Sequence, residues 1–105
     1  MSKIFFKKTF LILIIIFTTS SNADDKMALG IEVYNNKAQC GVCHTLKSAG
    51  SNGQIGPNLD VVKPTIEQII LTVTSGIGVM PSFKDTLSKE EIESLAHYIF
   101  NNTNK

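Results

Sequence analysis

The sequence contains no arginine and no tryptophan, and it has only two cysteines. Without arginine and without a cluster of lysines, the chain has no basic stripe of the kind that neutralises phosphates, so we expect no nucleic-acid partner. A single cysteine pair cannot form the disulfide framework on which many small exported domains depend. After residue 17 no apolar run approaches the roughly 20 residues that a membrane span requires.

The N-terminal segment has the three parts of a secretory signal. Basic residues occur over 3–8, an unbroken apolar run (FLILIIIF) follows over 10–17, and Ser21-Asn22-Ala23 fits the small-residue rule for cleavage. We therefore predict a signal peptide over residues 1–23 and one mature domain over residues 24–105, exported to the periplasm. The alternative is a retained membrane anchor, but the apolar run is too short to span a bilayer. After cleavage, no membrane span is expected.

Removal of the predicted signal changes the charge and size that matter for folding. The full chain has a formal net charge of +1, whereas residues 24–105 keep seven lysines against nine acidic residues, a net charge of −2. A chain this small builds only a modest core and is often stabilised by disulfides, a metal or a cofactor. A disulfide between Cys40 and Cys43 would close a very short loop and stabilise little. We therefore expect the two cysteines to serve another purpose.

The mature region shows helical periodicity in place of strand alternation. A first helix is predicted over about 26–37, with Leu29, Val33 and Tyr34 on one apolar face. Gly30 weakens the interior of this helix, which suggests that another element approaches closely there; the alternative is a glycine that the helix simply tolerates. Residues 48–60 are rich in glycine and predict an irregular loop.

Capping boxes mark two further helices. Thr65 and Gln68 form the first capping box, and Gly76 ends the helix that begins there. The β-branched residues of this segment also allow a strand. Ser88 and Glu91 form the second, followed by the last helix. The fold class is therefore predicted to be all-α.

The chemistry is concentrated in residues 40–44, which read Cys-Gly-Val-Cys-His. This C-x-x-C-H pattern is the attachment signature of c-type haem. Thiols three residues apart project from one side of a helical turn and can reach two vinyl groups on one porphyrin edge, while His44 turns onto the iron. Three alternatives stay open. A thioredoxin-like dithiol also uses C-x-x-C, but it belongs near a βαβ pattern that is missing here. A zinc site needs about four ligands, and the third alternative is a chance match or a local disulfide.

A methionine often lies opposite histidine on the haem iron of an electron carrier. Met80 lies in a segment broken by glycines and followed by proline, so its thioether is held on irregular backbone; the alternative is a loop residue packed on the core. Met27 falls in the first predicted helix, where packing accounts for it. His97 is the rival ligand, but it lies at the margin of the apolar face formed by Ile92, Leu95, Ala96 and Ile99. We predict Met80 as the second ligand.

Four motifs occur in order along the mature chain. They are Cys40-Gly41-Val42-Cys43-His44, Gly56-Pro57-Asn58-Leu59, Val79-Met80-Pro81 and Leu95-Ala96-His97-Tyr98-Ile99. In this order they resemble the class I cytochromes c of the short bacterial type. The segments 41–60 and 77–83 also resemble small cytochromes that accept electrons from sulfite dehydrogenases.

The resemblance implies a small cytochrome c fold, with three to four helices around one covalently bound haem. It implies thioethers at Cys40 and Cys43, iron ligands at His44 and Met80, and a Pro57 carbonyl that accepts the His44 ring N–H. It also implies that the first and last helices cross, with Gly30 and Tyr34 against Leu95 and Tyr98. Because arginine and tryptophan are absent, the resemblance leaves open how the acid groups of the haem are neutralised.

The function expected from this set is single-electron transfer between redox proteins, with no substrate bond made or broken. The partners would be a dehydrogenase donor and a terminal oxidase or other acceptor. A dedicated cytochrome subunit of an oxidoreductase such as a sulfite dehydrogenase is the main alternative. A haem enzyme or gas sensor would need an open iron site, and a thiol redox protein would need free cysteines. Four apolar residues would rim the haem edge, namely Val42, Ile77, Val79 and Phe83. We expect Lys47 and Lys84 to serve solubility; the alternative is that they steer an acidic partner.

Overall fold

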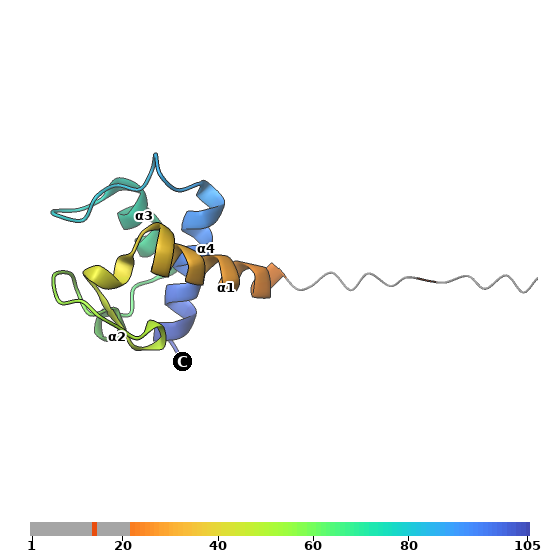
Figure 1. Ribbon diagram of the computed structural model, residues 1–105, viewed down its shortest axis with the longest axis horizontal. Coiled ribbons are helices and arrows are strands. Elements are labelled where there is room, and N and C mark those ends of the chain that lie inside the picture. The colour runs from red at the N-terminus through yellow and green to blue at the C-terminus, as the bar shows by residue number, and fades with distance from the viewer. Residues whose placement is uncertain (1–13, 15–21) are drawn as a thin grey trace, which may run out of the picture.

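The computed structural model describes Ile14 and residues 22–105 (Figure 1). Most of the predicted signal segment, residues 1–23, lies outside the described residues, so its cleavage after Ala23 stays a prediction. Within the part of the chain that the structure describes, no helix is both long enough and apolar enough to cross a membrane.

Helices dominate the described chain, which confirms the all-α fold class. The elements are α1 (Asn22–Glu32), the π-helical turn η1 (Val33–Lys37), the short 3-10 turn η2 (Cys40–Val42), β1 (Thr45–Leu46), η3 (Lys47–Ala49), β2 (Ser51–Asn52), α2 (Leu59–Val62), α3 (Ile66–Ser75) and α4 (Lys89–Thr103). The two strands are only two residues each and pair antiparallel, with Thr45 opposite Asn52 and Leu46 opposite Ser51.

The centre of the fold is the crossing of α1 over α4, which Figure 1 shows as an orange helix across a blue one. A side chain at Gly30 would collide with the Ser94 carbonyl and would lie 2.5 Å from the Tyr98 Cβ. The close approach expected from Gly30 is thus confirmed. Tyr34 packs edge-on against Tyr98, with ring centroids 5.7 Å apart, and Leu95 is fully buried in the same core.

Both predicted capping boxes are formed, and they set the start of α3 and α4. The Thr65 Oγ1 accepts the Gln68 N–H at 3.1 Å, and the Gln68 Oε1 accepts the Thr65 N–H at 2.9 Å. Ser88 and Glu91 make the same reciprocal pair at 3.1 and 2.8 Å. Because residues 66–75 are helical, the strand alternative for that segment is wrong; Gly76 ends α3 with a positive φ of 74°.

Two boundaries differ from the sequence prediction. The first helix begins at Asn22, four residues before the expected position 26, and its last turn widens into η1. The loop predicted over 48–60 contains β2 and the beginning of α2. These elements are only two and four residues long, so they carry no periodicity of their own. The Asn58 side chain, which accepts the Asp60 N–H at 2.9 Å, caps the short α2.

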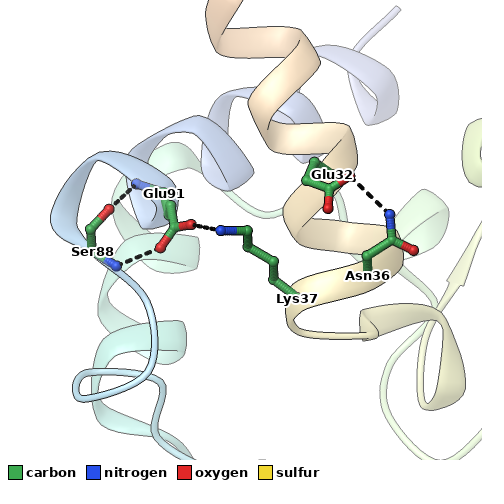
Figure 2. Close-up of polar contacts among 5 residues, drawn as sticks. All are labelled: Glu32, Asn36, Lys37, Ser88 and Glu91. Carbon is green, nitrogen blue, oxygen red and sulfur yellow. Dashed lines mark hydrogen bonds and ion pairs between the residues drawn. The ribbon is translucent and has the colours of Figure 1, made fainter.

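A polar link joins the end of η1 to the beginning of α4 (Figure 2). The Lys37 Nζ lies 2.6 Å from the Glu91 Oε2, while the other carboxylate oxygen of Glu91 accepts the Ser88 N–H. On the preceding turn, the Asn36 amide donates to Glu32 at 2.9 Å. The link connects the segment that leads into Cys40 with the last helix.

Candidate haem site

The C-x-x-C-H segment forms one tight turn whose backbone is held by its own hydrogen bonds. Gln39 enters it in the left-handed conformation (φ 51°), and the Cys40 carbonyl accepts the N–H groups of Cys43 at 3.2 Å and His44 at 3.0 Å. Both cysteine side chains are partly buried. At Gly53 an added Cβ would lie about 2.5 Å from the Cys43 carbonyl carbon, so this glycine lets the following loop close against the turn.

The imidazole of His44 is oriented by the loop that follows. Its Nδ1 lies 2.7 Å from the Pro57 carbonyl oxygen, which can only accept, so Nδ1 carries the proton. The lone pair is then on Nε2, the atom left for a metal. Gly56 packs on the ring face, because a Cβ there would lie 2.6 Å from the His44 Cε1. The contact implied by the resemblance is present, while its role in haem ligation stays a prediction.

Met80 lies at the end of a tight two-residue turn. Ile77 and Met80 exchange backbone hydrogen bonds at 3.1 and 2.9 Å, and Gly78 between them has a positive φ of 57°. The loop is tied back to α3, where the Ser82 Oγ donates to the Thr74 carbonyl at 2.6 Å and the Phe83 N–H donates to the Val73 carbonyl at 2.9 Å. The methionine is therefore held on an anchored loop.

The four residues predicted to hold the haem line one cavity. Its volume is about 540 Å³, within the range of cofactor sites, and its walls come from the C-x-x-C-H turn, the Pro57 loop, α3, the Met80 loop and α4. Cys40, Cys43, His44 and Met80 all line it. The rest of the lining is mostly apolar, which suits a flat porphyrin that must be shielded from water.

The rival ligands lie elsewhere in the fold. His97 is half-buried on α4 and does not line the cavity. Met27 does not line it either; its sulfur lies 3.6 Å from the Asn101 amide nitrogen, and its side chain packs on the core. Among the described residues no group of three or more His, Cys, Asp or Glu side chains is placed to hold a metal ion, so the zinc alternative finds no ligand set there.

The electrostatics of the site do not suit thiol redox chemistry. The pKa of the Cys40 thiol is raised to about 12, chiefly by burial; a backbone hydrogen bond lowers it by less, and the nearby Cys43 makes a smaller contribution to the rise. Reactive dithiols have lowered pKa values because the thiolate is the nucleophile. A thiol that stays protonated at neutral pH argues against a C-x-x-C oxidoreductase.

The roles of three residues at the site have no signal in the sequence. Gly56 belongs to a motif, but the motif does not indicate that it packs on the imidazole. No pattern indicates that Gln68 and Thr72 contribute to the cavity wall. Gln68 stands out in the sequence only as a helix cap. Its second role could be found only once the position of α3 was known.

A thiol pair, an oriented imidazole and a thioether around one apolar cavity in a helical domain define a c-type cytochrome. The chain belongs to the cytochrome c family described as cytochrome c oxidase, cbb3-type, subunit III, whose profile matches residues 25–99.

Relatives agree with this assignment. Cytochrome c6 of Leptolyngbya boryana is 35% identical over 82 residues, which cover 74% of this chain and 94% of that protein. The chloroplastic cytochrome c6 of Chlamydomonas reinhardtii is 35% identical over 91 residues, which cover 77% of this chain but only 57% of the relative. The crystal structure of the c-type cytochrome SorU from Sinorhizobium meliloti superposes with a TM-score of 0.73 at 43% identity, covering 78% of this chain and 95% of that one.

These comparisons confirm the predicted cytochrome c fold and the predicted class of protein. The protein is a monohaem c-type cytochrome with one covalent haem c, and it carries electrons between redox partners. The residues that attach the haem and bind its iron stay predictions.

Proposed function

We propose that this cytochrome is an exported, periplasmic electron carrier in which Cys40 and Cys43 form the haem thioethers and His44 and Met80 bind the iron. The observation that carries the proposal is the single cavity lined by all four side chains, with the His44 ring already oriented by Pro57. The haem, when bound, supplies a reversible one-electron change at its iron.

The residues of the chain determine how that change proceeds. The Pro57 carbonyl holds the His44 tautomer whose Nε2 would be free to bind the iron, and the anchored loop would present the Met80 sulfur to it. A soft thioether and a dry, apolar lining favour the ferrous state and raise the reduction potential.

An optical redox titration of the purified holoprotein tests this proposal. We expect a single one-electron wave at a clearly positive potential, because histidine–methionine ligation raises the potential. A strongly negative potential would contradict Met80 as a ligand. Binding of carbon monoxide by the reduced, native protein would also count against a carrier and favour a gas sensor or haem enzyme.

Export and cleavage require a separate measurement. The proposal places the mature N-terminus at Asp24, after the Ser21-Asn22-Ala23 site. Intact mass spectrometry of the protein from a periplasmic fraction should give the mass of residues 24–105 plus one haem. A haem-loaded chain that keeps residues 1–23 and sediments with membranes would instead indicate a retained anchor.

A second candidate is a dedicated electron acceptor of an oxidoreductase such as a sulfite dehydrogenase. The resemblance over residues 41–60 and 77–83 favours it, and so do large apolar side chains exposed at the cavity, such as Ile77 and Val79. A freely diffusing carrier has small, weak interfaces, below about 1,200 Å². Stable co-purification with a larger catalytic chain would support the dedicated subunit, and transient association would support the free carrier.

A further inference from the structure

Among the residues that the structure describes, none with a charged side chain lines the cavity assigned to the haem. A haem carries two carboxylic acid groups, and an ionised carboxylate that is removed from water without a partner is costly. The chain offers neither arginine nor tryptophan as a partner. The acid groups must therefore be met by neutral hydrogen-bond donors, by solvent, or by both.

Three lining side chains carry an amide or a hydroxyl: Gln39, Gln68 and Thr72. Gln39 directly precedes Cys40, so it belongs to the wall where the two thiols meet the vinyl-bearing rings. The acid groups of a haem are on its other two rings, so in a haem attached at this wall they would be directed away from it. A side-chain donor to them would therefore come from a different element, and α3 supplies Gln68 and Thr72 one helical turn apart on one face.

Gln68 is the better placed of the two because its orientation is fixed. Its Oε1 accepts the Thr65 N–H at 2.9 Å in the capping box, so the carbonyl end of the amide is occupied. The amide nitrogen, with two N–H groups, makes no hydrogen bond among the described residues. We propose that the Gln68 amide nitrogen donates a hydrogen bond to a carboxylate of the haem, an inference that rests on the proposed haem site.

Charged side chains on the surrounding elements are not available as donors to the haem carboxylate. Lys63 is next to two lining residues, but its Nζ donates to the Thr103 carbonyl at 2.6 Å. Lys37 is paired with Glu91 (Figure 2), and the Asp60 carboxylate accepts the Lys47 N–H at 2.8 Å. The other charged or titratable residues on these elements do not line the cavity; they are Glu67, Lys84, Asp85, Lys89, Glu90, Glu93, His97 and Tyr98.

The expected effect is on the reduction potential. A negative carboxylate near the iron favours the ferric state, and a donated hydrogen bond offsets part of that charge. Gln68 therefore raises the potential. The Gln68 side chain thereby links the start of α3 to the haem. Its amide oxygen caps the helix, and its amide nitrogen donates to a carboxylate of the haem.

Two substitutions separate these roles. Gln68→Glu keeps an oxygen that can accept the Thr65 N–H, because glutamate also serves in capping boxes, but it donates no hydrogen bond and adds a negative charge. Gln68→Leu removes both the cap and the donor without adding charge. Glu91→Gln is the control, since it changes the same position of the other capping box, away from the cavity. The readouts are the midpoint potential of each holoprotein and the propionate bending mode in its resonance Raman spectrum.

We expect the midpoint potential to shift downward in both Gln68 variants, more for glutamate than for leucine, and the propionate mode to shift in both. The control should leave both readouts unchanged. An unchanged propionate mode overturns the proposal even if the potential moves, because the amide would then act on something other than the acid group. If the leucine variant fails to fold, the glutamate variant decides alone. Wild-type protein without covalent haem would refute the site itself, a result distinct from a failure at Gln68.

Discussion

At the scale of single residues, the role of Met80 can be tested by removing its sulfur. Met80→Ala should lower the reduction potential and open the iron to external ligands, because the soft thioether that favours the ferrous state is gone. Redox titration and carbon monoxide binding measure the two effects. Met27→Ala is the matched control, since Met27 packs on the core outside the cavity. An unchanged potential in Met80→Ala would show that another group binds the iron.

Gly56 is a second residue whose size matters to the site. Gly56→Ala would place a methyl group 2.6 Å from the His44 Cε1 and 3.0 Å from Nδ1, so either the ring or the loop must move. Overpacking of this kind costs about 1–3 kcal/mol of unfolding free energy. We expect lower stability and an altered haem spectrum.

Gly50→Ala provides the comparison for Gly56. Gly50 has a positive φ of 68° with open space around it, so alanine there brings backbone strain of about 1–2 kcal/mol without touching the histidine. Denaturation curves should show a loss of stability in both variants. The haem spectrum should change only in Gly56→Ala. Identical haem spectra in the two variants would contradict the packing of Gly56 against the His44 ring.

The residues that we predict to hold the haem belong to local motifs. Spacing and residue type indicate the C-x-x-C-H turn and Met80 beside Pro81, whereas the role of Pro57 is implied by the family resemblance. Gly56, as a packing surface for the His44 ring, and Gln68, as part of the cavity wall, could not be read that way. Their roles arise because segments 12 or more residues apart in the chain come together, and no local pattern records that approach.

At the scale of elements, the link between Lys37 and Glu91 predicts a dependence of stability on pH. The side-chain hydrogen bond from Lys37 and the backbone N–H of Ser88 lower the pKa of the Glu91 carboxyl. A carboxyl with a lowered folded-state pKa stabilises the fold above its unfolded pKa, and this stabilisation is lost as the pH falls through the folded pKa. The contribution is therefore present at neutral pH and disappears in acid.

Lys37→Gln should remove part of this pH dependence. Urea denaturation at pH 7 and at an acidic pH below the usual range of glutamate gives the comparison, and the wild type should lose more stability between the two. Lys47→Gln is the control, because the Lys47 side chain makes no ion pair among the described residues. Identical pH dependence in wild type and Lys37→Gln would show that the exposed pair contributes nothing measurable.

Elements differ in how far their own residues define them. α3 and α4 begin where their capping boxes predict, because a cap is a contact within four residues. The first predicted helix, over about 26–37, includes the residues of η1 but not its π-helical form. The four-residue α2 was not predicted, since a single turn is too short for periodicity and depends on what packs beside it. Gly30 is intermediate: its place in the sequence suggested a close approach, and the crossing with α4 explains it.

At the scale of the whole molecule, the distribution of charge predicts how the protein meets its redox partners. Residues 24–105 have a net charge of −2, but none of their charged side chains lines the cavity. Exposed apolar residues stand at its rim, including Val42, Ile77 and Val79. The rate of electron exchange through this rim should therefore depend on ionic strength less than the net charge of −2 implies. The reason is that the charge close to the contact sets how strongly salt changes the rate of an encounter.

Small inorganic oxidants of opposite charge test this directly. The reduced protein gives one electron to hexacyanoferrate(III), an anion, or to tris(phenanthroline)cobalt(III), a cation, and stopped flow measures both rates across ionic strength. We expect a weak salt dependence with both reagents. Val79→Lys should make the rate with the anion fall as salt rises, because it places a positive charge at the rim. Val61→Lys adds the same charge at an exposed site outside the cavity and should have a smaller effect. Equal effects of the two lysines would mean that electrons leave through another part of the surface, and the apolar rim would then have no part in docking.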